Sequence, residues 1–251
     1  PDIIGQDLDR GFLLLSDLGR ETYLDVLNDD NADALFADAI DALIRIQSTA
    51  VPATLPAYDE ALLYRELQLF PTWYLGTHRG ITLEEPLGRE LQQVFDLLVT
   101  EAMGQGRVLV HRDYMPRNLM VSTPNPGVID FQDAVLGPVS YDPICLFRDA
   151  FISWPETRVQ AWLREYWLQA RAAGVPVADS FERFYEQAEL MGAQRHLKVI
   201  GIFSRICHRD GKPDYLADVP RFFAYLRAAI ERRPQLAGLK TVLDALGDAA
   251  A

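Results

Sequence analysis

The sequence is poor in cysteine, in basic residues and in long apolar runs. Its two cysteines, Cys145 and Cys207, form no CxxC pair, which argues against a disulfide framework and predicts a reducing, cytoplasmic location. Lysine and arginine total 24 against 36 aspartates and glutamates, so the formal net charge of −12 argues against binding of nucleic acid through its phosphates. Apolar stretches such as 11–15 and 197–203 are far shorter than the roughly 18 residues that cross a bilayer. We therefore expect neither a nucleic-acid partner nor a membrane span.

The amino-acid composition is typical of a packed globular protein. Hydrophobic residues make up 49% of the 251 residues, charged residues 24% and aromatic residues 10%, which excludes a disordered chain and a collagen-like repeat. The sequence shows no repeat with a period of roughly 20 to 50 residues, so a solenoid is excluded as well. We expect one mostly helical domain that contains a small strand-rich region.

The spacing of apolar residues places this strand-rich region in the middle of the chain. Short apolar runs at 108–110, 119–121 and 128–129 are separated by polar residues and a Pro-Asn-Pro-Gly turn, which predicts strands. A glycine-bounded run over 10–19 predicts one buried strand, the only one expected before residue 107. Elsewhere apolar residues recur every three or four positions, as in amphipathic helices, with Asn31 or Asp30 placed to cap the first. The predicted helices are 31–46, 59–69, 83–103, 143–152, 155–173, 178–208, 216–232 and 236–246.

The chemically informative segments are His111-Arg-Asp-Tyr-Met-Pro-Arg-Asn118 and Val128-Ile-Asp-Phe131. The first matches the pattern H-R-D-x-x-x-x-N of a phosphoryl-transfer catalytic loop, and the second contains the aspartate of a D-F-G-like element. Phosphoryl transfer requires a group that orients a hydroxyl and takes its proton, and groups that hold divalent ions against the nucleotide phosphates. The pattern therefore predicts Asp113 as the base, Asn118 and Asp130 as Mg²⁺ ligands, and ATP as the donor.

The predicted strands explain how the two metal ligands meet. A strand up to residue 121, a turn and a second strand up to residue 129 form a hairpin, which brings Asn118 and Asp130 to neighbouring positions where they can share a magnesium site. The alternative is that the H-x-D motif marks only a capped turn or a structural ion pair. Four elements agree in identity and order, and this agreement favours the catalytic interpretation.

On these motifs the chain resembles the C-terminal lobe of the aminoglycoside phosphotransferase and choline kinase branch of the protein-kinase-like fold. The resemblance implies an α+β fold with a mostly helical lobe, a short catalytic β-hairpin and a residual hinge strand. A closer resemblance is to bacterial kinases that phosphorylate the anomeric hydroxyl of N-acetylmuramate and N-acetylglucosamine in cell-wall recycling. The segments that carry it are 12–19, 110–118, 130–134, 137–142, 195–198 and 205–212.

The resemblance also assigns supporting roles around the catalytic loop. His111 corresponds to a histidine that braces the loop, and Asp142 to an aspartate that forms hydrogen bonds beneath it. A plain helix N-cap before Pro143 explains Asp142 equally well. Arg117 stands four residues after the base, where it either reaches an acidic group or the transferred phosphoryl, or extends into solvent.

Further positions match the family pattern or depart from it. Ser16, Asp17 and Leu18 resemble the hinge whose backbone groups meet adenine. Arg112 stands where the commoner pattern has glycine, and the third residue of the D-F-G-like element is Gln132. These departures argue against a protein kinase with a flipping activation segment.

One expected part of the nucleotide site is not found in the sequence. No glycine-rich G-x-G-x-x-G loop occurs, and no lysine precedes Lys198. The groups that hold the α- and β-phosphates are therefore expected upstream of Pro1. We predict that residues 1–19 are the remnant of an N-terminal lobe and hinge, that residues 20–251 form the helical lobe, and that this chain by itself binds ATP poorly and is inactive.

A local group of basic residues follows one predicted helix in this acidic chain. Lys198, Arg205 and Arg209 recur at helical spacing and share roughly one face. Such a face either meets an anionic substrate group, for example a lactyl carboxylate, or pairs with acidic residues of neighbouring helices, which is the commoner outcome.

The residues together predict an ATP- and Mg²⁺-dependent small-molecule kinase whose partners are a sugar and ATP. One alternative keeps the chemistry and changes the acceptor to an aminoglycoside, choline or homoserine. Another is a non-catalytic, kinase-like binding module. The retained Asp113, Asn118 and Asp130 favour an enzyme, because a decayed site usually loses at least one of its charged groups.

Overall fold

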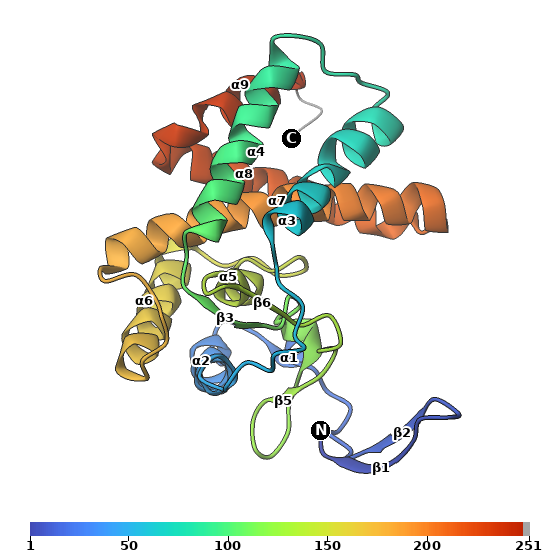
Figure 1. The fold of residues 1–251 in the computed structure, drawn as a ribbon, viewed down its shortest axis with the longest axis vertical. Coiled ribbons are helices and arrows are strands. Elements are labelled where there is room, and N and C mark those ends of the chain that lie inside the picture. Colours follow the sequence, from blue (N-terminus) through green and yellow to red (C-terminus); the bar gives the residue numbers. More distant parts are fainter. Residues whose placement is uncertain (248–251) are drawn as a thin grey trace.

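The computed structural model describes residues 1–247, and one long helix runs through its middle (Figure 1). This helix, α7 (Phe181–Asp210), packs against α4 (Leu87–Met103), α5 (Tyr141–Phe147) and α8 (Val219–Arg232). Residues 187–201 of α7 are all buried, so this helix is the centre of the fold rather than a surface element. Within the described residues, no helix is both long and apolar enough to cross a bilayer.

The helices predicted from apolar periodicity are confirmed. Besides those around α7 they are α2 (Ala32–Gln47), α3 (Glu60–Leu67), α6 (Glu156–Ala172) and α9 (Ala237–Ala245). Helix α5 ends earlier than predicted, because the Asp149 carboxylate accepts the N–H groups of Phe151 and Ile152 and turns the chain. The structure adds the single turn α1 (Tyr23–Val26), the π-helical η1 (Phe70–His78), and the 3₁₀ turns η2 (Pro116–Asn118), η3 (Pro213–Asp218) and η4 (Pro234–Leu236).

Helix α2 begins where the sequence predicts, but neither predicted residue caps it. Asn31 occupies the N-cap position, yet its side chain accepts the N–H of Asn28 and donates to the carbonyl of Val26. The side chain therefore stabilises the preceding turn instead of the helix end. Asp59 and Ser180 do cap α3 and α7, each by accepting a backbone N–H of the first turn.

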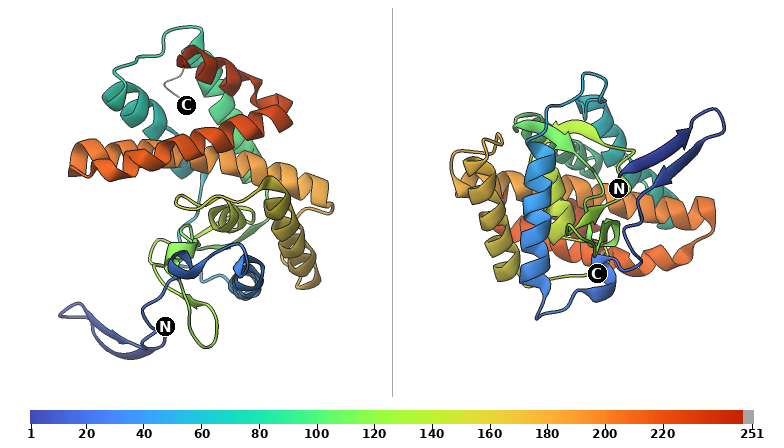
Figure 2. Two further views of the ribbon diagram at one scale, coloured as in Figure 1. Left: turned by 180° about the vertical axis from the view of Figure 1, so that it is seen from behind. Right: turned by 90° about the horizontal axis from the view of Figure 1, so that it is seen from below.

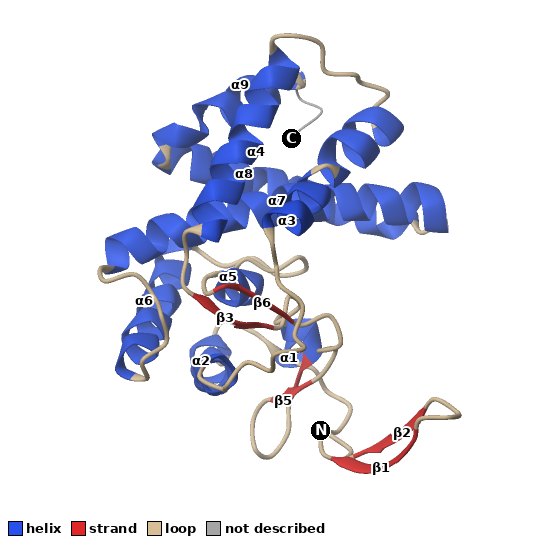
Figure 3. Ribbon diagram, viewed as in Figure 1, coloured by secondary structure: helices blue, strands red, loops and turns tan. Residues whose placement is uncertain are grey.

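The catalytic region contains two short antiparallel strand pairs. Strand β3 (Arg107–Val110) pairs with β6 (Val135–Pro138), and β4 (Leu119–Met120) pairs with β5 (Gly127–Val128). The second pair is the predicted hairpin. Strand β6 was not predicted, because its Gly137 and Pro138 are untypical of strands. Figure 3 shows these strands on one side of α7, while α8 and α9 lie on the other.

The prediction of a single buried strand before residue 107 is wrong, both in the number of strands and in their burial. Residues 1–16 form an antiparallel hairpin of β1 (Ile3–Asp7) and β2 (Phe12–Leu15), so two strands precede residue 107. The side chains of β2 are exposed, for example Phe12 at 67% and Leu14 at 61%. The hairpin extends away from the helices (Figure 2), and therefore its apolar residues are not part of the core described for residues 1–247.

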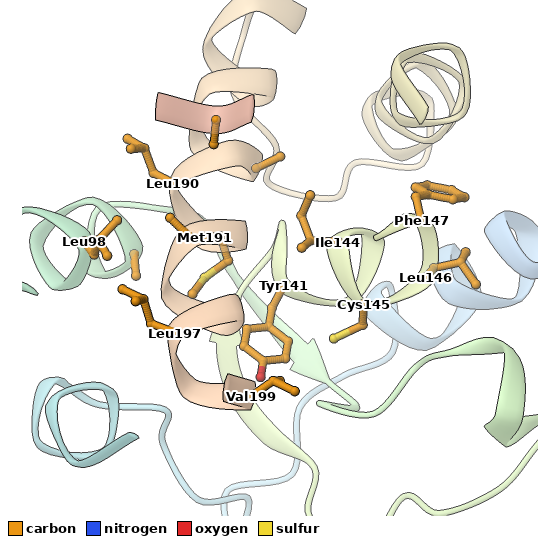
Figure 4. Close-up of a cluster of buried hydrophobic side chains, with 14 of the residues drawn as sticks. Leu98, Tyr141, Ile144, Cys145, Leu146, Phe147, Leu190, Met191, Leu197 and Val199 are labelled. Carbon is orange, nitrogen blue, oxygen red and sulfur yellow. The ribbon is translucent and has the colours of Figure 1, made fainter. Parts of the chain in front are cut away.

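Two close packing relationships hold the catalytic side of the molecule against α7. Tyr141 and Ile144 of α5 lie in one buried layer with Met191 and Leu197 of α7 (Figure 4). Further along the helix, a Cβ atom at Gly201 would lie 2.4 Å from the carbonyl carbon of Leu69, so η1 and α7 can approach this closely only through glycine. These contacts pack α7 closely against the side of the molecule that carries the catalytic loop.

Candidate active site

The predicted catalytic loop follows β3 and is held from below by Asp142. Its carboxylate accepts the N–H of His111 at 2.8 Å and the N–H of Arg112 at 3.0 Å. Asp142 lies inside the first turn of α5, whose N-cap is Ser140, so the alternative of a plain N-cap is wrong. Burial raises the pKa of Asp142 to about 7, while the two N–H groups act in the opposite direction.

His111 links the loop to the strand that precedes Asp130. Its Nδ1 accepts the N–H of Asp113 at 3.3 Å, so Nε2 carries the proton that is donated to the carbonyl of Ile129 at 3.0 Å. Burial lowers the pKa of His111, which keeps the ring neutral and preserves this donor and acceptor pattern. His111 therefore connects the catalytic loop to the segment that carries Asp130.

The two predicted metal ligands lie side by side. The Asn118 amide nitrogen is 3.4 Å from the Asp130 carboxylate, and it also donates to the carbonyl of Asp113 at 2.9 Å. The N–H of Ile129 bonds the carbonyl of Asn118, which completes the register of the β4 and β5 hairpin. Asp130 has a φ of 67°, a left-handed conformation that turns it out of the strand. Gln132 donates to its carboxylate at 2.8 Å.

The donor chemistry of this pair fits Mg²⁺. Asn118 offers an amide oxygen and Asp130 a carboxylate, and Mg²⁺ typically takes one or two protein oxygen ligands together with phosphates and water. Residues 1–247 contain no group of three or more histidine, cysteine, aspartate and glutamate side chains arranged to hold a metal.

Asp113 faces a cavity of about 360 Å³ that we call the Asp113 cavity. Asp113 is half-buried and forms part of the wall of this cavity. Five cations and two carboxylates line the cavity together with apolar residues. The charged residues are Arg112, Asp113, Arg117, Asp133, Arg195, Lys198 and Arg205. An excess of positive charge therefore surrounds Asp113 in a chain whose formal net charge is −12.

Arg112, beside Asp113, adopts an unusual backbone conformation. Its φ of 74° lies in the left-handed region, where glycine is favoured. The side chain pairs with Glu66 and lies 5.5 Å from the centre of the Tyr58 ring. The Cys145 thiol donates to its carbonyl at 3.2 Å. Contacts of the Arg112 side chain and of its carbonyl group therefore stabilise a backbone conformation that is otherwise unfavourable.

Glu66 is a buried centre of this network that sequence reasoning missed. Its carboxylate pairs with Arg112 and with Lys198 at 2.9 Å, and accepts hydrogen bonds from Tyr58 and Gln194. Burial acts to raise the pKa of Glu66, but Lys198, Tyr58 and Arg112 outweigh it, so this pKa is lowered and the group stays ionised. The available signal was a carboxylate next to Leu67 on the apolar face of a predicted helix.

The structure separates the three residues of the predicted basic face. Lys198 lines the Asp113 cavity but is already paired with Glu66 and donates to the Tyr141 hydroxyl at 2.9 Å. Arg205 lines the cavity and its Nε is buried without a partner. Arg209 is exposed, pairs with Asp210 at 2.6 Å, and is not among the lining residues. The three residues share one face of α7 as predicted, but Lys198 and Arg209 follow the alternative of pairing with acidic residues.

Two further arginines lie in the cavity wall near Asp113. Arg117 is exposed, and its guanidinium is 5.2 Å from the centre of the Phe151 ring, so it is not simply extended into solvent. Arg195 is buried and interacts electrostatically with Asp113. The sequence analysis included Arg195 only in the matching segment 195–198 and did not place it at the site. Its spacing of three residues from Lys198 was the signal.

The predicted hinge lies between the exposed hairpin and the catalytic region. Ser16 exchanges backbone and side-chain hydrogen bonds with Asp2, at 2.9 and 2.8 Å. Asp17 accepts the N–H of Gly19 through its side chain, and Leu18 packs against Gly127 of β5. The segment therefore runs close to the hairpin that carries Asn118 towards Asp130.

Comparison with known proteins agrees with these features. The model of the phosphotransferase enzyme family matches residues 1–175. An N-acetylmuramate/N-acetylglucosamine kinase from Pseudomonas putida is 64% identical over 239 residues, which cover 95% of this chain and 70% of that protein. A protein of the same name from Pseudomonas aeruginosa is 63% identical over 246 residues, which cover 98% of this chain and 73% of that protein.

The fold recurs in a solved structure of low sequence identity. The choline kinase LicA from Streptococcus pneumoniae superimposes with a TM-score of 0.61 at 15% identity, covering 90% of this chain and 74% of that one. This likeness confirms the predicted α+β, kinase-like fold class. With the catalytic-loop geometry and the family match over residues 1–175, it identifies the chain as a member of the phosphotransferase enzyme family.

Proposed function

We propose that the protein transfers the γ-phosphate of ATP to the anomeric hydroxyl of N-acetylmuramate and N-acetylglucosamine, and so returns cell-wall sugars to metabolism in the cytoplasm. The names of the two relatives with more than 60% identity support the choice of sugars. The single structural observation that carries the proposal is the positive Asp113 cavity.

The charge of this cavity discriminates between the candidate acceptors. Aminoglycosides are polycations and choline is a cation, so either would meet like charge from the cations of the wall that Glu66 does not neutralise. N-acetylmuramate carries a lactyl carboxylate, which is attracted to the same wall, and N-acetylglucosamine is neutral. The cavity therefore favours an anionic or neutral sugar over the acceptors of other kinases that share this fold.

Asp113 acts as the base in the proposed reaction. The anomeric oxygen attacks the γ-phosphorus, its proton passes to the Asp113 carboxylate, and the bond from phosphorus to the bridging oxygen breaks to release ADP. An anomeric hydroxyl is more acidic than an ordinary alcohol, so a carboxylate of modest basicity is sufficient. His111 and Asp142 position the loop, and Arg117 is placed to stabilise charge on the transferred phosphoryl.

Asn118 and Asp130 are proposed as the residues that hold Mg²⁺, which would neutralise charge on the nucleotide phosphates. The backbone of Ser16, Asp17 and Leu18 is proposed to meet the adenine. The division into an N-terminal hinge segment, residues 1–19, and a helical lobe, residues 20–251, is part of this proposal, and positions 248–251 lie outside the described residues.

The test is to incubate the complete gene product with Mg-ATP and each acceptor in turn. N-acetylmuramate and N-acetylglucosamine are compared with an aminoglycoside, choline and homoserine. We expect phosphate on the two amino sugars only, in an acid-labile product whose phosphorus couples to the anomeric proton by NMR. Phosphate on a 6-hydroxyl would overturn the anomeric assignment, and binding of sugar without any turnover would favour a non-catalytic module.

A further inference from the structure

The cations of the Asp113 cavity differ in how far their charge is already neutralised. Lys198 and Arg112 share the buried carboxylate of Glu66, and Lys198 also bonds the Tyr141 hydroxyl. A charge that is paired and hydrogen-bonded in this way gains little from a second anion, because its donors are occupied. These two cations are therefore part of the wall rather than free ligand-binding groups.

Two other arginines lie at the end of the cavity where the reaction takes place. Arg195 lines the same cavity as Asp113 and donates to the carbonyl of Arg148 at 3.4 Å. Arg117 lies over the Phe151 ring within the catalytic loop region. Their position favours contacts with the reacting groups, where both acceptor sugars are chemically the same.

Arg205 shares the lack of an ion pair with Arg117 and Arg195, but it comes from the C-terminal part of α7. Within residues 1–247 the side chain of Arg205 forms no hydrogen bond and no ion pair at contact distance, and only the charge of Asp210 acts on it at longer range. Charges that are partly removed from water are normally paired, so an arginine without an ion pair in a cavity wall points to an anionic ligand group. Ile202 and Ile206, on the same helix, and Tyr215 line the cavity beside it, and this apolar surrounding strengthens a pair with an anion.

The position of Arg205 along α7 separates it from Arg195 and from the reacting end of the cavity. Ten residues separate it from Arg195, which corresponds to about 15 Å along a helix, and helical side chains lean back towards the N-terminus. A sugar whose anomeric hydroxyl lies at Asp113 directs the substituent on its third carbon away from the reacting end. The lactyl carboxylate of N-acetylmuramate is that substituent, and N-acetylglucosamine has a hydroxyl there.

We infer that Arg205 is the residue that recognises the lactyl carboxylate, and that Lys198 and Arg209 do not contribute to this selectivity. The inference rests on the proposed function and narrows it to one specificity-determining side chain. Recognition by Arg205 is compatible with binding of both sugars, because a neutral acceptor needs no charged partner at this position.

The first experiment changes the substrate and not the protein. Binding of N-acetylmuramate and of its lactyl methyl ester to the wild-type protein is measured by calorimetry, alongside kcat/KM in the complete gene product. A hydrogen bond to a charged group typically changes affinity by roughly ten- to hundredfold, and we expect the ester to bind more weakly by this factor. Equal binding of acid and ester would overturn the inference without any concern about folding of a variant.

The second experiment uses Arg205→Gln, which keeps hydrogen-bonding capacity and removes the charge. We expect this variant to lose the preference for acid over ester and to lower kcat/KM for N-acetylmuramate roughly ten- to hundredfold. For N-acetylglucosamine the value should stay within about twofold. Arg205→Lys should recover part of the selectivity. The exposed Lys212→Gln, which lies outside the cavity lining, serves as the control.

A third experiment tests whether the other two residues of the predicted basic face contribute to the selectivity for the carboxylate. It uses the variants Arg209→Gln and Lys198→Met. We expect Arg209→Gln to leave the acid-to-ester ratio at its wild-type value, and Lys198→Met to weaken both sugars to the same extent. Selective loss of the acid in either variant, or equal loss of both sugars in Arg205→Gln, would contradict the inference. Turnover of neither sugar by the complete gene product would instead contradict the proposed function.

Discussion

The Glu66 carboxylate lies 2.9 Å from the Lys198 ammonium in the interior of the molecule. The first residue comes from α3 and the second from α7, and the same carboxylate pairs with Arg112 of the catalytic loop. One buried anion thus connects two helices to the residue beside the predicted base. The pair determines both the stability of the cavity wall and the charge that the wall presents.

Removal of this charge should destabilise the fold. Glu66→Gln leaves Arg112 and Lys198 buried without their anion, and breaking a buried ion pair typically costs about 3 to 5 kcal/mol. We expect a decrease of this order in the free energy of unfolding, measured by urea denaturation. Glu60→Gln, an exposed change of the same type in the same helix, should cost less than about 0.5 kcal/mol. Similar midpoints for the two variants would show that Glu66 is not the neutralising group.

Asp113 and Asp130 should have separable effects on catalysis. In the complete gene product, Asp113→Asn should remove nearly all turnover while nucleotide affinity is largely kept, because a base acts on the acceptor in the transition state. Asp130→Asn should in addition weaken binding of Mg-ATP. Calorimetry with Mg-ATP and measurement of kcat distinguish the two variants. Near wild-type kcat in Asp113→Asn would show that another group accepts the proton.

The pKa of Asp142 should make stability and activity respond to pH in opposite directions. Burial raises this pKa from 3.8 to about 7, so the folded protein binds the proton more readily than the unfolded chain does. Stability from this group is therefore present at low pH and is lost as pH rises to about 7. A protonated carboxyl cannot accept both loop N–H groups, so kcat should fall as pH decreases below about 7.

The Asp142→Asn variant isolates this group. The difference in free energy of unfolding between wild type and variant should shift in favour of the wild type as pH falls from 8 to about 5. Urea denaturation at several pH values measures the shift, and a difference that does not depend on pH would show that Asp142 has an ordinary pKa.

Arg112 allows a test of backbone strain beside the base. Arg112→Gly and Arg112→Ala both remove the pair with Glu66, but only glycine adopts a φ of 74° without cost. We expect the glycine variant to be more stable than the alanine variant by about 1 kcal/mol, the typical cost of a left-handed conformation. Thermal unfolding of the two proteins gives this comparison. An alanine variant at least as stable as glycine would indicate that the loop relaxes to another conformation.

Much of this protein is determined by its sequence alone. The helical periodicity predicts the positions of α2, α4 and α6, because an amphipathic helix needs a continuous apolar stripe regardless of what covers it. The catalytic-loop motif and the hairpin that follows predict that Asn118 and Asp130 approach each other, because only a short turn separates them along the chain. Local features of this kind depend on neighbouring residues.

Only the tertiary structure decided the composition of the cavity and the state of its charges. Lys198, Arg205 and Arg209 look alike in sequence, yet one is neutralised by Glu66, one has a buried and unpartnered Nε, and one pairs with Asp210 on the surface. Glu66 is more than 100 positions away from Lys198 in the chain, and no spacing rule connects them. The free energy of a charge depends on which groups surround it after folding, and residues distant in sequence provide those groups.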